Sequence, residues 1–161
     1  MHLVSFGRRL LWPLLFLGAA LPALAHEIRP AVVTVTFADN RYQIEINANL
    51  EAVLAGVSPR HKDTIESPNA KRYDELRQLS PSELVARIET FQEKFLEGIQ
   101  VEFDGGRAQP ALDAVEVPEI GDLRVARLSV AKLSGAIPVG AKVFRWRYAA
   151  GFGDNVVRLR A

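Results

Sequence analysis

Histidine is the residue type best suited to metal chemistry in this chain, and its placement decides what that chemistry is. His26 is followed directly by Glu27, and His61 lies in a polar segment that also carries acidic residues. Cleavage after Ala25 would make His26 the first residue, and a terminal amine and an imidazole can then chelate one ion in a geometry suited to copper. We therefore predict a site formed by His26, Glu27 and His61 for a divalent metal such as copper or nickel. The alternative is that His26 is an ordinary exposed polar residue.

Other reaction chemistry has little support in the sequence. The chain has no cysteine, which excludes thiolate metal sites, iron–sulfur clusters and cysteine nucleophiles. No nucleophile elbow, zinc-protease helix or phosphate-binding loop is present. We therefore expect that the protein is not an enzyme.

The first 25 residues have the pattern of a secretory signal peptide. Two arginines precede the apolar run 10–21, Pro22 follows it, and alanines occupy positions −3 and −1 of a cleavage site after Ala25. The alternative is a membrane anchor, but the run is too short to cross a hydrocarbon core of about 30 Å. We predict that residues 1–25 are removed and that the mature protein begins at His26, in the periplasm or on the extracytoplasmic face of a bacterial membrane.

The remaining residues, 26–161, have the size of one domain. Both basic residues of the signal segment leave with it, so the 20 basic residues of the whole chain fall to 18 against 19 acidic ones. A domain this close to neutral is not expected to bind nucleic acid.

Strand patterns dominate this domain. Alternating apolar residues over 33–48, with a turn at Asp39 and Asn40, predict a β-hairpin. Further short strands are expected around 99–103, 107–117, 122–132, 141–149 and 155–160, because turn residues separate them. The sequence therefore predicts a mainly β fold, an antiparallel β-sandwich with a helical insertion at about 57–98.

Within the insertion, residues 57–70 have the composition of a loop and one helix is expected at about 81–97. Ser80 and Glu83 form a capping-box pattern at its start, and Gly98 stands where a left-handed cap would end it. Leu84, Ile88, Phe91 and Phe95 repeat at helical spacing, so we expect them to form the packed face.

Four arginines alternate with apolar residues on the last two predicted strands: Arg145, Arg147, Arg158 and Arg160. If these strands are neighbours, the arginines form a basic stripe. The stripe would be either a solvated sheet face or a contact for anionic headgroups or an acidic partner.

Several segments resemble the N-terminal extracytoplasmic region of HupE/UreJ-like bacterial membrane proteins. They are residues 25–31, 49–56, 67–70, 73–77 and 115–118, the last followed by Gly121-Asp122. The resemblance implies a β-rich domain that precedes a helical membrane domain, in a family associated with nickel or cobalt uptake. The membrane helices of that family are absent from these 161 residues, and the end of the sequence at Ala161, directly after a predicted strand, fits a shortened or split version of such a protein.

Two functions follow as expectations. The first is a non-catalytic accessory or interaction domain of a HupE/UreJ-like membrane protein, with a membrane domain or membrane protein as its partner. The second is a free periplasmic metal-binding protein that uses the N-terminal histidine.

Overall fold

The computed structural model of the 161-residue chain describes residues 29–61 and 64–160. The predicted signal peptide and two of the three predicted metal ligands, His26 and Glu27, lie outside these residues.

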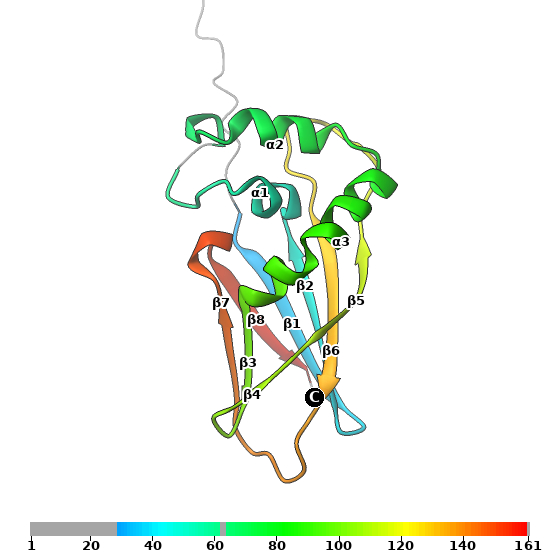
Figure 1. Ribbon diagram of the computed structural model, residues 1–161, viewed down its shortest axis with the longest axis vertical. Helices are drawn as coiled ribbons and strands as arrows, with labels where there is room; N and C mark the ends of the chain where they lie inside the picture. The colour runs from blue at the N-terminus through cyan, green and yellow to red at the C-terminus, as the bar shows by residue number, and fades with distance from the viewer. Residues whose placement is uncertain (1–28, 62–63, 161) are drawn as a thin grey trace, which may run out of the picture.

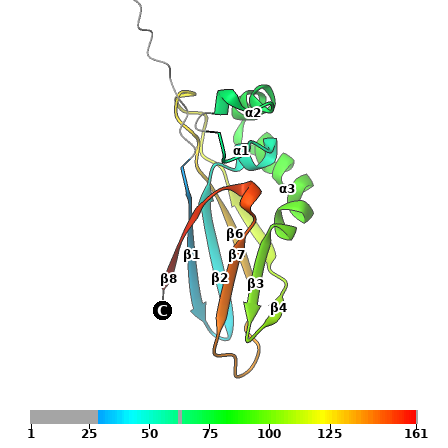
Figure 2. The same ribbon diagram turned by 90° about the vertical axis from the view of Figure 1, so that its left-hand side faces the viewer.

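Two facing β-sheets form the body of the protein, as Figures 1 and 2 show. The first sheet has five strands in the order β5-β6-β2-β1-β8, which are β5 (Ala111–Glu116), β6 (Ser129–Ala136), β2 (Arg41–Ala48), β1 (Ala31–Ala38) and β8 (Asn155–Arg160). The second has three strands in the order β4-β3-β7, which are β4 (Gly106–Ala108), β3 (Ile99–Phe103) and β7 (Phe144–Tyr148). The predicted mainly β fold is confirmed, with the difference that β8 pairs with β1 in parallel.

The hairpin of β1 and β2 is the centre of the five-stranded sheet. Asp39 and Asn40 connect the two strands with φ values of 50° and 57°, the left-handed conformations of a two-residue hairpin turn. The alternating apolar side chains of both strands face the second sheet and are buried: Val33, Val35, Tyr42, Ile44 and Ile46. This hairpin agrees with the alternation in the sequence.

Three helices lie between β2 and β3 in the chain. They are α1 (Leu50–Ala55), α2 (Ala70–Arg77) and α3 (Pro81–Glu97), with a short 3-10 turn at Thr64–Glu66 before α2. A second 3-10 turn, Ala150–Phe152, connects β7 to β8. Figure 1 shows α1 and α2 over one end of the sheets, with α3 descending from that end. The expected loop over 57–70 therefore contains a 3-10 turn and ends where α2 begins, and α2 itself was not predicted.

Helix α3 has the bounds and the cap that the sequence predicts. The Ser80 hydroxyl accepts the Glu83 amide at 3.4 Å, and the Glu83 carboxylate accepts the Ser80 amide at 2.9 Å. Leu84, Ile88 and Phe95 are buried, whereas Phe91 is only partly buried. The packed face is therefore narrower than expected.

Gly98 follows α3 for a different reason from the predicted one. Its φ is −76°, so it is not a left-handed cap. A Cβ at Gly98 would lie 2.2 Å from Cε2 of Phe152, so the glycine is required for the close approach of this ring.

We expect Ser80→Ala to lower the free energy of unfolding by about 1 kcal/mol, because the substitution removes the N-cap acceptor. Chemical denaturation measures the change, with Glu89→Ala, at an exposed position farther along α3, as the control. The bonds from Ser80 lower the pKa of the Glu83 carboxyl, so its contribution is present near neutral pH and is lost as the pH falls and the carboxylate protonates. Equal stability of the two variants would contradict the role of the cap.

Candidate functional site

The predicted metal site is represented among the described residues only by His61. This residue is partly exposed in a turn, where its amide donates to the Ser58 carbonyl at 3.2 Å. Within residues 29–61 and 64–160, no group of three or more histidine, aspartate or glutamate side chains could hold a metal ion. The described part of the chain therefore gives His61 no set of protein ligands.

The turn that carries His61 nevertheless adjoins the segment that holds the start of β1. The Ala31 amide donates to the Asp154 carbonyl at 2.8 Å. A Cβ placed on the preceding Gly153 would lie 3.6 Å from Cβ of Pro59. Segment 153–154 therefore holds the first strand through Asp154 and lies near the loop of His61 at Gly153.

The expected basic stripe does not form, because β7 and β8 belong to different sheets. Arg145 and Arg147 share the outer face of β7, where Arg145 lies 4.0 Å from Glu102. Arg158 and Arg160 pair in register with threonines of β1, on the outer face of the other sheet. The two arginine pairs therefore face opposite sides of the sandwich.

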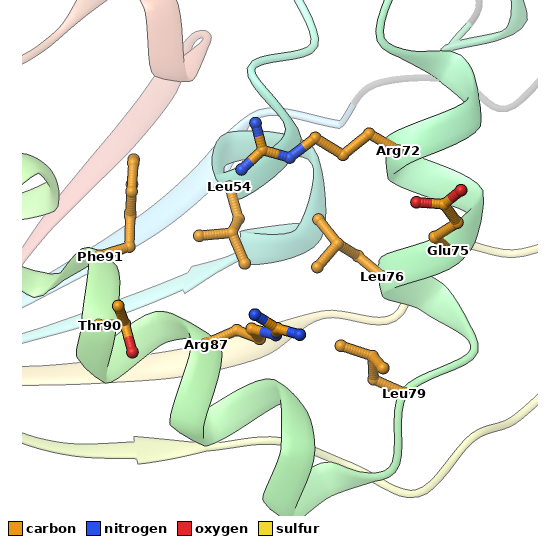
Figure 3. Close-up of a pocket in the computed structure, with 8 residues that line it drawn as sticks. All are labelled: Leu54, Arg72, Glu75, Leu76, Leu79, Arg87, Thr90 and Phe91. Carbon is orange, nitrogen blue, oxygen red and sulfur yellow. The ribbon is translucent and has the colours of Figure 1, made fainter.

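A groove between α2 and α3 is a candidate binding site, with a volume of about 360 Å³. Four apolar side chains from the three helices and the α2–α3 connection line it: Leu54, Leu76, Leu79 and Phe91. Figure 3 shows Arg72 reaching from α2 across Leu54, and Arg87 reaching from α3 toward Leu76 and Leu79. Glu75 and Thr90 complete the lining.

Arg72 and Arg87, against the single carboxylate of Glu75, give this groove a net positive charge. Both are exposed, and neither forms an ion pair with another residue in the described part of the chain. A guanidinium group beside apolar side chains retains its donors for a carboxylate while its stem packs on the apolar surface. The groove therefore suits a ligand that combines an apolar body with a negative charge.

Polar contacts fix the helices that form the groove. Asn49 caps α1 by accepting the Ala52 amide at 3.1 Å, and its Nδ2 donates to the Tyr73 hydroxyl of α2 at 2.7 Å. Burial raises the pKa of Tyr73, so its hydroxyl stays neutral. Arg77 lies 5.2 Å from the centre of the Tyr73 ring and donates to two carbonyls of segment 117–128, one of them Val125 at 3.0 Å.

A buried ion pair forms the second fixed point. Nε of Arg127 donates to Oε1 of Glu51 at 2.8 Å, with side chains that are 8% and 0% exposed. Nη1 of Arg127 also donates to the Leu79 carbonyl at 3.1 Å. Because Glu51 is on α1 and Leu79 lines the groove, this pair holds two of its walls together. Glu51 Oε2 and Arg127 Nη2 are buried and form no hydrogen bond with the described residues.

None of these residues was predicted as a site residue, because most of them have no local signal in the sequence. Nothing in the sequence distinguishes Arg72 and Arg87 from ordinary exposed arginines on helices. Glu51 and Arg127 are separated by 76 positions, so no motif connects them. Only the Asn49 cap has a local pattern, a polar residue directly before an apolar helical turn.

The fold and the groove define a two-sheet, mainly β domain with a helical layer at one end. Comparison of the chain with protein-family models, curated proteins and solved structures gives no match. In the part of the chain that the structure describes, no helix is long and apolar enough to cross a membrane.

Proposed function

We propose that the mature chain is a non-catalytic extracytoplasmic accessory domain of a HupE/UreJ-like membrane protein, and that it binds a segment of a partner protein. The signal-peptide pattern of residues 1–25 supports the location. The sequence resemblance supports the association with a membrane protein and with metal-ion uptake.

The observation that carries the binding role is the groove between α2 and α3. Its apolar lining and the guanidinium groups of Arg72 and Arg87 are complementary to an amphipathic segment with acidic residues beside large apolar ones. The occupant that we propose is such a segment, supplied by the membrane partner. The Glu51–Arg127 pair supports this role because a groove with fixed walls loses less entropy on binding.

Binding of a model peptide tests the proposal. The probe is a blocked peptide of about ten residues in which leucine and glutamate repeat at helical spacing, titrated into the isotope-labelled protein by NMR. We expect shifts at the backbone amides of α2 and α3. Arg72→Ala and Arg87→Ala should each weaken binding about five-fold, which corresponds to about 1 kcal/mol for an exposed charge pair.

Two controls accompany this titration. Arg107→Ala removes an exposed arginine of β4, away from the groove, and should leave the affinity unchanged. A peptide with lysine in place of glutamate should bind more weakly than the original. Equal binding of the two peptides, or no effect of either groove variant, would contradict the proposed partner chemistry.

The alternative function is metal binding by a free periplasmic protein. The observation that favours it is the position of segment 153–154, which bonds to the start of β1 through Asp154 and lies near Pro59 of the His61 loop at Gly153. This arrangement brings His61 to the end of the sheet where β1 begins. His26 precedes that strand in the chain, and in this alternative it binds a metal ion together with His61.

We expect the exported protein, if its intact mass shows that it begins at His26, to bind divalent copper more tightly than nickel or zinc. Binding should weaken as the pH falls, because protons compete for the amine and the imidazole. Calorimetry on this protein is compared with a variant that has one extra residue before His26. Equal affinities, or no binding tighter than about 100 μM, would make His26 an ordinary exposed residue.

A further inference from the structure

The inner face of β8 carries apolar side chains that the second sheet leaves exposed. Val157 and Leu159 pair in register with Val33 and Val35 of β1, so they point to the same side of the sheet. The two β1 residues are fully buried, yet Val157 is 39% and Leu159 is 65% exposed. The core face of the five-stranded sheet therefore extends beyond the part that the three-stranded sheet covers.

The aromatic contacts between the sheets show which strand position would cover this face. Tyr42 of β2 packs against Phe103 of β3 at 5.5 Å, and Phe37 of β1 packs against Phe144 of β7 at 5.3 Å. Strand β3 thus faces β2, and β7 faces β1. A fourth strand beside β7 would face β8.

The edges of both sheets are open at this side. Strands β7 and β8 each end the order of their sheet among the described residues, so each has one edge without a strand partner. Figure 2 shows the two strands meeting at the Ala150–Phe152 turn and diverging toward the opposite end of the molecule. Near that turn Trp146 donates to the Asn155 side chain at 3.1 Å, which links β7 to the start of β8.

The outer face of β7 carries a positive charge. Arg145 and Arg147 are both exposed there, and the 4.0 Å contact with Glu102 involves only Arg145. Residues on the outer face of a strand beside β7 would lie next to these arginines. Acidic side chains are therefore favoured at those positions.

We propose that this open edge binds an extended segment of a partner protein by strand addition to β7. Apolar side chains of the segment cover Val157 and Leu159, and alternate acidic side chains lie beside Arg145 and Arg147. Main-chain hydrogen bonds to an exposed edge supply affinity, and alternate side chains supply specificity. This surface is separate from the groove between α2 and α3.

The test uses a blocked peptide of about eight residues that alternates isoleucine and glutamate. The full chain carries Trp12→Phe, so that Trp146 is the only tryptophan and its fluorescence reports on β7. We expect saturable binding, a change in Trp146 emission, and slower hydrogen exchange of the β7 amides. Leu159→Gln and Arg147→Glu should each weaken binding at least about five-fold.

Matched variants separate this edge from other surfaces. Val139→Gln changes an apolar residue that is fully exposed in another loop, and it should leave the affinity unchanged. Arg72→Ala should also have no effect, which distinguishes this binding from that of the groove. A lysine-containing peptide should bind Arg147→Glu more tightly than the unsubstituted protein, since the charges are then reversed.

Three results would overturn the proposal. The first is the absence of saturable binding. The second is binding that neither Leu159→Gln nor Arg147→Glu changes. The third is a dimer in sedimentation whose β7 amides are already protected without peptide, which would identify a second copy of the chain as the occupant.

Discussion

Replacing Glu51 with alanine is expected to lower the free energy of unfolding by about 3–5 kcal/mol. The carboxylate is fully buried and accepts Nε of Arg127 at 2.8 Å. Its removal leaves the largely buried Arg127 guanidinium with too few acceptors. Chemical denaturation of Glu51→Ala beside the unsubstituted protein measures the loss.

A double substitution shows whether the loss comes from the unpaired charge. Glu51→Leu combined with Arg127→Met removes both charges and retains side-chain volume, so we expect it to be more stable than Glu51→Ala. The recovery should be partial, because Arg127 also donates to the Leu79 carbonyl. A cost below about 1 kcal/mol for Glu51→Ala would mean that the pair contributes little to the fold.

The same variant tests how the ion pair supports the groove. Glu51 is on α1 with Leu54, and Arg127 holds the backbone of Leu79, which lines the other side. Loss of the pair should therefore broaden the NMR signals of residues around the groove even where the protein remains folded. The Glu51→Ala variant should also bind the leucine–glutamate peptide more weakly.

Local patterns predicted the parts of the fold that depend on neighbouring residues. The hairpin of β1 and β2 follows from alternation and from Asp39-Asn40, whose side chains tolerate a positive φ. Helix α3 follows from the capping box at Ser80. Helix α2 was missed because its eight residues contain only Tyr73 and Leu76 as large apolar residues, too few for a helical repeat to be recognised.

Contacts between distant segments account for what the sequence could not predict. The parallel pairing of β8 with β1 joins the two ends of the domain, and no local signal distinguishes it from an antiparallel hairpin with β7. That pairing separates Arg145 and Arg147 from Arg158 and Arg160. Gly98 is a similar case, because its small size is needed by Phe152, a residue more than fifty positions later.

The second large loss of stability is expected from truncation of a buried residue of α3. Phe95 is 1% exposed and stacks on Phe152 with ring centres 5.7 Å apart. We expect Phe95→Ala to lower the free energy of unfolding by about 3–5 kcal/mol, because it leaves a cavity in the core and removes this stacking. Thermal and chemical denaturation give the value.

Phe91→Ala is the matched control, because both residues are phenylalanines on the same helix. Phe91 is only partly buried and lies at the groove, with the Lys94 ammonium 5.8 Å from the centre of its ring. Its truncation should therefore cost about 1–2 kcal/mol, since less apolar area returns to water and no closed cavity forms. It should also weaken the binding of the leucine–glutamate peptide, which Phe95→Ala affects only through stability. Equal stability losses for the two variants would mean that α3 packs on a different face, with Phe91 as deeply buried as Phe95.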